Sequence, residues 1–311
     1  MTQAPQITGA SWAMVGLLGV TWGGTFLVTE LALVGITPFW LAASRIVLGA
    51  AVMLVIWAAH GGTLFRGPVG PGAIANLLAS GAITSAIPFT LLAWGQQYVT
   101  SSFAGVAMAA VALMVLPLAH LLLPGEQMTW RRTLGFVIGF AGVFTLIGGQ
   151  FFDSTGASRE GAGQLACLGA AFCYGFSSVL MRRLPDVDPL GLATILLCIG
   201  AVLIVPVAWA QEGPPPLPDT GTLYTIAFLG LVPTAAANLL RVTVIRTAGP
   251  VFLSLTNYQV PVWSVIFGAL FLGEALPPSL LLAMALILVG VALSQWGALK
   301  RLFGVAGAQS S

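Results

Sequence analysis

The chain has 311 residues, of which 58% are hydrophobic and 6% are charged, and its formal net charge is +2 at pH 7. About a quarter of the residues in a soluble domain are charged, so a water-facing surface of this size would need far more charge. Lipid is therefore the expected solvent for the outer surface. The weak net charge and the lack of a basic cluster argue against nucleic acid as a partner.

The three cysteines, Cys167, Cys173 and Cys198, all lie within apolar segments. Their odd number and apolar surroundings indicate small packing residues rather than disulfides or metal ligands. We expect neither a metal nor another cofactor.

Ten stretches are apolar enough to cross a ~30 Å hydrocarbon core as helices, which takes about 20 residues each. In chain order they are Trp12–Leu33, Pro38–Ala59, Ala73–Trp94, Ser102–Leu123, Trp130–Gly149, Gln164–Met181, Pro189–Ala210, Thr222–Val244, Val251–Leu272 and Leu280–Leu299. Lipid forbids unpaired backbone groups, and the alternating polar positions of a barrel strand are missing. The predicted fold is an all-α membrane protein with ten transmembrane helices.

Basic residues predict the orientation, since cytoplasmic loops are enriched in Lys and Arg. With the N-terminus in the cytoplasm, Arg159 alone falls in an outer loop. The residues that then lie at the cytoplasmic face are Arg66, Arg131, Arg132, Arg182, Arg183, Arg246, Lys300 and Arg301. The sequence therefore predicts that both termini are cytoplasmic, in a bacterial inner membrane.

The two halves of the chain repeat each other. Gly125-Glu126 after the fourth stretch is matched by Gly273-Glu274 after the ninth, and Trp22-Gly23 is matched by Tyr174-Gly175. Five helices per repeat is an odd number, so the repeats must be inverted, which is typical of transporters. The predicted parts are a first repeat (1–150), an extracytoplasmic linker (151–163), a second repeat (164–299) and a cytoplasmic tail (300–311).

The chain resembles the EamA-type families of the drug/metabolite transporter superfamily over almost its whole length. The matching features are Trp22-Gly23-Gly24-Thr25-Phe26, the in-membrane Arg45 and the two Gly-Glu turns. Within that superfamily it looks most like the YddG amino-acid exporters. The resemblance implies a central cavity enclosed by helices one to four and six to nine. The position that corresponds to Arg45 in the second repeat is near Leu196. Any role of the arginine therefore has no counterpart in that repeat.

Polar and aromatic residues near the middle of apolar helices are expected to face the protein interior or a cavity. The candidate substrate-binding residues are Trp22, Thr25, Arg45, Ser85, Tyr174, Ser177, Asn238, Asn257 and Tyr258, and Thr234 lies at a similar depth. The alternative is that they join helices, and Ser and Thr often bond to their own helix. Trp22 and Tyr174 hold equivalent positions and could face each other. Pro88 and Pro233 are the candidate hinges.

Charged groups within the spans allow two interpretations. Arg45 could bind a substrate carboxylate, or it could form a structural ion pair, for which Glu30 is the candidate. Arg241 is expected to be an interface anchor. Glu126 and Glu274 are expected to cap the fifth and tenth helices. The small-residue face of Gly135, Gly139 and Gly142 suits either contact within the chain or a weak dimer.

The predicted function is export of amino acids, including aromatic or bulky apolar ones, by alternating access. Transport is expected to be facilitated or to proceed by exchange, because no carboxylate lies near mid-membrane. The alternatives are a drug, nucleoside or nucleotide-sugar exporter and a proton-coupled antiporter. A channel would favour a ring of identical side chains or a carbonyl filter sequence, and neither is visible. An enzyme would need a group of titratable catalytic residues, and the sequence shows no paired carboxylates, histidine cluster or nucleophile motif. The expected partners are lipid and a small substrate, with the protein a monomer or weak dimer.

Overall fold

The computed structural model describes residues 7–152, 159–300 and 302, and this part of the chain is helical with no named strand. The first half comprises α1 (Gly9–Ala32), α2 (Pro38–Ala59), α3 (Pro71–Gly81), α4 (Ile87–Gly95), α5 (Ser101–Ala109), α6 (Val111–Leu122) and α7 (Trp130–Phe152). The second comprises α8 (Glu160–Met181), α9 (Pro189–Glu212), α10 (Thr220–Leu229), α11 (Ala237–Thr247), α12 (Pro250–Leu253), α13 (Thr256–Leu272) and α14 (Pro278–Ser294).

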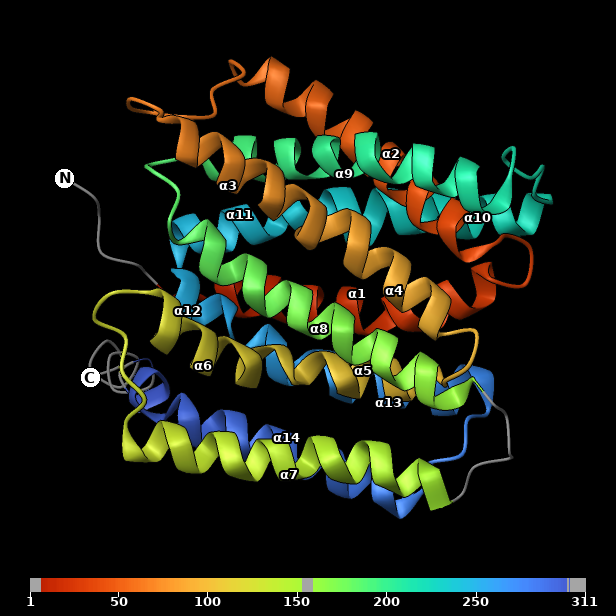
Figure 1. The fold of residues 1–311 in the computed structure, drawn as a ribbon, viewed down its shortest axis with the longest axis vertical. Helices are drawn as coiled ribbons and strands as arrows, with labels where there is room; N and C mark the ends of the chain where they lie inside the picture. Colours follow the sequence, from red (N-terminus) through yellow and green to blue (C-terminus); the bar gives the residue numbers. More distant parts are fainter. Residues whose placement is uncertain (1–6, 153–158, 301, 303–311) are drawn as a thin grey trace.

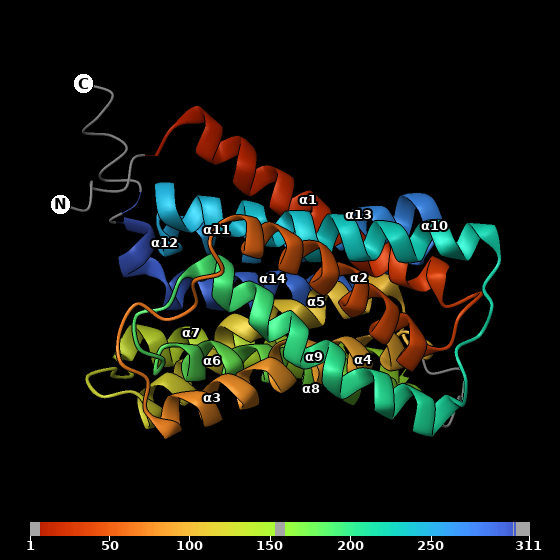
Figure 2. The same ribbon diagram turned by 90° about the horizontal axis from the view of Figure 1, so that it is seen from above.

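Nine helical stretches in the described residues are long and apolar enough to cross a membrane, which confirms a multi-pass helical protein. The tenth predicted stretch corresponds to α14, whose 17 residues make it shorter than the others. The long helices lie side by side along a common direction (Figures 1 and 2). The predicted linker 151–163 is helical at both its ends, and residues 153–158 lie outside the described part, as do most residues of the predicted tail.

The helix contacts occur in matched pairs between the two halves. Helix α2 packs on α9, and α7 packs on α14, so equivalent helices of the two halves meet each other. Helix α1 of the first half packs on α13 of the second half. Helix α8 of the second half packs on α6 of the first half, which is the equivalent contact with the halves exchanged. The substrate path of such an arrangement is expected between the halves.

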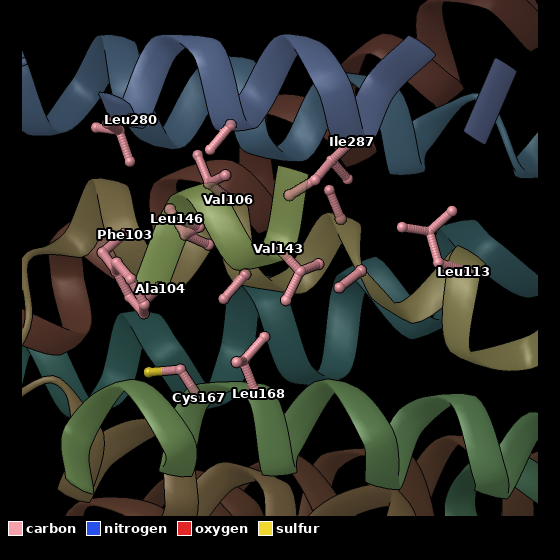
Figure 3. Packing of buried hydrophobic residues seen from close by; sticks show 14 of the residues in the cluster. Phe103, Ala104, Val106, Leu113, Val143, Leu146, Cys167, Leu168, Leu280 and Ile287 are labelled. Atoms are coloured by element: carbon pink, nitrogen blue, oxygen red, sulfur yellow. The ribbon is translucent and has the colours of Figure 1, made fainter. Parts of the chain in front are cut away.

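The interface of α7 and α14 explains the small-residue face of the fifth stretch. A Cβ added at Gly135 would lie 2.5 Å from the Gly290 carbonyl oxygen, and one at Gly142 would lie 2.9 Å from the Ala283 carbonyl oxygen. Glycine therefore lets the two backbones touch. These glycines serve contacts within the chain. Figure 3 shows the adjoining core, in which Phe103 and Leu113 pack near Leu146 and Ile287.

Charged residues concentrate at one end of the bundle and join loops of both halves. Asp188 forms ion pairs with Arg66 at 3.0 Å and with Arg246 at 2.6 Å. Glu126 pairs in the same way with Arg132 and Arg182, at 3.0 and 3.1 Å. Glu126 therefore acts mainly as an ion-pair centre, not as the cap predicted for the fifth helix.

Acidic residues at the other end bind helix N-termini. Glu212, at the end of α9, accepts the backbone N–H groups of Phe39 and Trp40 at the start of α2, at 3.2 and 3.1 Å. Glu274 accepts the backbone N–H groups of Ser101 and Ser102 at 2.7 and 3.0 Å. Glu274 thus caps α5, and the prediction that it caps the tenth helix is wrong. Carboxylates suit these positions because helix N-termini carry partial positive charge.

Candidate functional site

Arg45 lies in α2 and is buried, with 8% of its surface exposed. Its Nη2 donates a hydrogen bond to Thr234 Oγ1 at 3.3 Å, and its guanidinium carbon lies 4.3 Å from the centroid of the Phe89 ring. Thr234 belongs to the second half of the chain, whereas Phe89 belongs to the first. A cation is therefore placed where the two halves meet, the position expected for a substrate site in a repeat transporter.

The predicted ion pair between Arg45 and Glu30 is wrong. Glu30 Oε2 instead accepts the Ser101 backbone N–H at 3.1 Å, and Glu274 accepts the same N–H group. Two carboxylates thus meet at the start of α5, away from the guanidinium. No ion pair to Arg45 occurs in the described residues, although a buried cation is normally neutralised by an anion.

The guanidinium of Arg45 is also incompletely hydrogen-bonded. Its Nε is buried and has no hydrogen-bond partner among the described residues. Leaving a buried donor unpaired costs about 1–3 kcal/mol, and more when the group is charged. An anion with two oxygens would satisfy both the charge and the free donors, because the guanidinium fork matches a carboxylate.

Aromatic side chains adjoin this cation. The ring centroids of Phe89 and Tyr174 are 6.5 Å apart, so Tyr174 of α8 extends the surface that begins at Phe89 of α4. Trp22 of α1 donates its indole N–H to the Pro233 carbonyl at 3.3 Å, next to Thr234. Trp22 and Tyr174 are therefore tied to different partners, Pro233 and Phe89. Phe89 escaped the sequence reasoning, because an apolar aromatic residue does not stand out within an apolar helix.

Two π-helical segments occupy equivalent places in the halves: η1 (Ala82–Ala86) before α4 and η2 (Gly230–Ala236) before α11. The predicted hinge Pro88 is the second residue of α4, which begins directly after η1. The other predicted hinge, Pro233, lies inside η2. Proline supplies no N–H, and π-bulges are frequent at functional sites. Both prolines are buried at the interface of the halves, and their role as hinges stays a prediction.

The π segments place hydroxyl groups against the facing helix. Thr234 of η2 packs directly on the backbone of Gly49 in α2. A Cβ at Gly49 would lie only 2.6 Å from Thr234 Cγ2, so glycine makes room for the threonine. Ser85 of η1 packs against Gly200 of α9 in the same way. Ser85 Oγ donates to the carbonyls of Gly81 and Leu196, at 2.9 and 3.2 Å. Ser85 therefore joins helices, and Thr234 does so while also accepting from Arg45.

Several predicted site residues bond within their own helix. The hydroxyl of Thr25 donates to the Thr21 carbonyl at 3.0 Å, and that of Ser177 donates to the Tyr174 carbonyl at 3.0 Å. Asn238 Nδ2 donates to the Thr234 carbonyl at 2.6 Å. The side-chain oxygen of Asn238 has no hydrogen-bond partner among the described residues, and this residue is only partly buried.

Asn257 and Tyr258 lie in the first turn of α13, as the seventh and eighth residues of the apolar stretch Val251–Leu272. Asn257 is exposed and has no side-chain hydrogen bond within the described residues. Tyr258 Oη and Gln295 Oε1 are 3.4 Å apart, so Tyr258 lies against the end of α14. The structure therefore does not bring these two residues to Arg45, although it does bring Thr234, Phe89 and Tyr174 there.

A multi-pass helical protein with an unneutralised cation between its halves has the construction of a small-molecule membrane transporter. Comparison with known proteins agrees, because the model of the EamA-like transporter family matches residues 8–148 and again residues 161–296. The chain belongs to this family, and the two matches correspond to its two halves.

Individual relatives are transporters as well. The chain is 28% identical over 297 residues to a probable terminal-alkyne amino-acid exporter of Streptantibioticus cattleyicolor, a match that covers 93% of this chain and 94% of the relative. It is 26% identical over 289 residues to the uncharacterized inner membrane transporter YedA of Escherichia coli K12, covering 90% and 89%. It is 24% identical to the S-adenosylmethionine/S-adenosylhomocysteine transporter of Chlamydia muridarum, covering 89% of each.

A solved structure shows the same fold, with a TM-score of 0.65 and 21% identity over 94% of this chain and 99% of the other. Together with the apolar helices and the inner-membrane relative, these matches show that the chain is a multi-pass inner-membrane transporter. It lies in the lipid bilayer and acts on a small molecule.

Proposed function

We propose that this protein exports amino acids across the inner membrane by alternating access, with Arg45 binding the α-carboxylate of the substrate. The carrying observation is the enclosed guanidinium, which has an unpaired Nε and no carboxylate partner in the described residues. A bound carboxylate would supply the missing charge and hydrogen bonds.

The relatives support an amino-acid substrate through shared chemistry. One is a probable exporter of terminal-alkyne amino acids, and another transports S-adenosylmethionine and S-adenosylhomocysteine. All of these compounds carry an α-amino group and an α-carboxylate. A site that recognises this common group through Arg45 fits each of them, whatever the side chain.

The surroundings of Arg45 favour bulky apolar or aromatic side chains. Phe89 lies against the cation and Tyr174 lies against Phe89, while Trp22 is bonded to Pro233, the residue before Thr234. Rings pack on other rings and on aliphatic chains with about 0.5–1.5 kcal/mol beyond the burial of area. Of the predicted binding residues, Trp22, Arg45, Tyr174 and Asn238 remain our proposal for direct contact. Thr25, Ser85 and Ser177 would instead shape the helices behind the site.

The proposed topology has ten spans in two inverted five-helix repeats, with both termini in the cytoplasm. Helix α14 would be the tenth span, because it packs along α7 and residues 296–300 continue as a helix. The basic residues Arg66, Arg132, Arg182 and Arg246 gather at one end, where the positive-inside rule puts the cytoplasm. We propose that the monomer is the transporting unit.

Transport would be facilitated or would proceed by exchange, since the described carboxylates are engaged away from Arg45. The second candidate mechanism is proton-coupled antiport. The observation in its favour is the meeting of Glu30 and Glu274 at one N–H group, because two adjacent carboxylates readily share a proton. A drug, nucleoside or nucleotide-sugar substrate is the alternative within the same family.

The test is flux through proteoliposomes that contain only this protein. Vesicles are loaded with a labelled amino-acid mixture, and efflux is followed with and without a proton gradient. We expect saturable efflux without a gradient, and competition by free amino acids but not by their carboxamides. Arg45→Gln should raise KM about 100-fold, as expected for the loss of one partner of a buried charge pair, whereas Arg131→Gln, at an exposed position, should not.

Absence of efflux for every amino acid, beside a reconstituted control transporter, would refute the substrate assignment. The same vesicles would then be loaded with nucleosides, nucleotide sugars and cationic drugs. Efflux that requires a proton gradient, and loses that requirement in Glu30→Gln, would replace facilitated transport with antiport.

A further inference from the structure

A second arginine, Arg241 of α11, is partly buried and lacks a counter-ion among the described residues. It has no ion pair or side-chain hydrogen bond among the described residues. An intermediate fraction of its surface is accessible. The burial of the neighbouring residues decides which way this accessible surface faces.

The burial pattern around α11 shows that this accessible surface faces the interior of the bundle. Successive residues of an α-helix advance by about 100°, so Arg241 lies on the side of α11 opposite the exposed Thr243 and Thr247. The residues on that inward side, Asn238, Arg241 and Ile245, are all partly accessible.

Buried residues flank this inward stripe on both sides. Ala237 and Val244 pack in a cluster with Val15 and Leu18 of α1, and Val242 is buried on the other flank. The accessible stripe thus lies between two packed edges, and lipid does not reach it. Arg241, predicted as an interface anchor, therefore lies on the interior side of its helix.

A similar partly accessible stripe lies on α8, whereas the opposite end of the bundle is packed. Tyr174, Ser178 and Met181 form a similar partly accessible stripe along the second half of α8. Toward the opposite end, every residue of Ser101–Ala107 in α5 is buried. The two partly accessible stripes therefore run from the region of Arg45 toward the end of the bundle that carries the basic loops.

Arg241 and the Arg45 site share one helix face. Thr234, Asn238 and Arg241 are spaced four and three residues apart, the spacing that aligns side chains along a helix. Seven residues separate Thr234 from Arg241, a rise of about 10 Å. A line of polar groups therefore leads from the hydroxyl that contacts Arg45 to the second cation.

We propose that Arg241 and Asn238 form a second carboxylate-binding site at the cytoplasmic mouth of the cavity, which captures the substrate anion before it reaches Arg45. The identity of the ligand rests on the proposed function, whereas the anion preference does not. A guanidinium beside an amide offers donors to the carboxylate and an acceptor to the α-ammonium group. Lipid phosphate is the competing ligand, and the packed flanks of the stripe disfavour it.

The first test does not depend on the substrate. Asn238→Cys is introduced together with Cys167→Ala, Cys173→Ala and Cys198→Ala, and inside-out vesicles are treated with thiol reagents. An anionic sulfonate-bearing methanethiosulfonate should react about tenfold faster than in the same protein with Arg241→Gln, because the cation raises the local anion concentration. A neutral methanethiosulfonate should react at similar rates in both, and Arg241→Lys should preserve the preference.

A thiol that no reagent reaches from the cytoplasmic face would overturn the proposal. So would an equal slowing of both reagents by Arg241→Gln, since that result indicates a structural change only.

The second test measures transport from each side. Arg241→Gln should raise KM for a labelled amino acid presented on the cytoplasmic side about tenfold, with the maximal rate and the KM from the other side unchanged. Arg131→Gln removes a charge from the same end and should match the wild type. If the wild type moves amino acids and Arg241→Gln leaves both KM values unchanged, the capture site is refuted while the proposed function stands. If the wild type moves none, the reagent test still decides on Arg241.

Discussion

The guanidinium of Arg45 in the first half of the chain donates a hydrogen bond to the hydroxyl of Thr234 in the second half. This contact ties the buried cation to η2, the π-helical segment that precedes α11. Because Thr234 also donates to the Leu229 carbonyl at 2.7 Å, its hydroxyl hydrogen is engaged and a lone pair is directed to Arg45.

Thr234→Val should therefore weaken substrate binding without unfolding the protein. Valine keeps the shape of threonine but removes the acceptor, and a hydrogen bond to a charged group contributes about 1.5–3 kcal/mol. We expect KM for amino-acid efflux to rise at least tenfold, with expression retained and the melting temperature lowered by only a few degrees. Thr234→Ser, which retains the hydroxyl, is the control, and equal KM values in all three proteins would contradict the proposed role.

Gly49→Ala should disrupt the contact between α2 and η2. A Cβ at Gly49 would lie 2.6 Å from Thr234 Cγ2 and 3.3 Å from the Gly230 carbonyl oxygen, so the helices must move apart. Overpacking of this kind costs about 1–3 kcal/mol. We expect a lower melting temperature in detergent and reduced efflux. Gly16→Ala is the matched control, since nothing lies within 4 Å of the added Cβ there and alanine favours the helix more than glycine does. A similar loss in both variants would show that the clash with Thr234 is not its cause.

Asp188→Asn should destabilise the end of the bundle that carries the basic loops. Burial raises the pKa of Asp188, but the Gly191 N–H, Arg66 and Arg246 outweigh it, and the net pKa lies below the usual value. A depressed pKa means that the carboxylate stabilises the fold at neutral pH and loses this effect as the pH falls below about 4. The melting temperature of Asp188→Asn should lie a few degrees below that of the wild type at pH 7, and the difference should shrink toward pH 3. A difference that does not change with pH would rule out the ionised carboxylate as its cause.

Glu274→Gln and Glu30→Gln should have unequal effects on stability. Glu274 accepts two backbone N–H groups and the Ser102 hydroxyl at the start of α5, and losing such a cap costs about 0.5–2 kcal/mol. Glu30 accepts one of the same N–H groups beside Glu274, so neutralising it relieves repulsion between carboxylates. Thermal unfolding in detergent should show a clear loss for Glu274→Gln and little change or a gain for Glu30→Gln. The reverse order would mean that Glu30, not Glu274, holds the start of α5.

The helical architecture could be predicted closely from the sequence, because lipid exposure requires long apolar stretches that composition reveals directly. Arg45 was identified for the same reason, as a charge within such a stretch. The contacts that Arg45 makes were not predicted. Counting residues along a helix gives the depth of a residue in the membrane but not the direction in which its side chain points. Glu30 was therefore assigned to Arg45, although it lies beside Ser101. Phe89 and the caps made by Glu212 and Glu274 depend on contacts between distant segments, which no local pattern encodes.

At the position equivalent to Arg45, the second half of the chain has Leu196, whose carbonyl accepts the hydroxyl of Ser85. The framework around the site is thus duplicated, while the charge is present once. In the proposed function, a bound amino acid would accordingly lie off the axis that relates the halves, with its carboxylate on the α2 side. The proposed site would then favour one orientation of the substrate over the orientation related to it by the two-fold rotation of the halves, and this one pose would serve both loading and release.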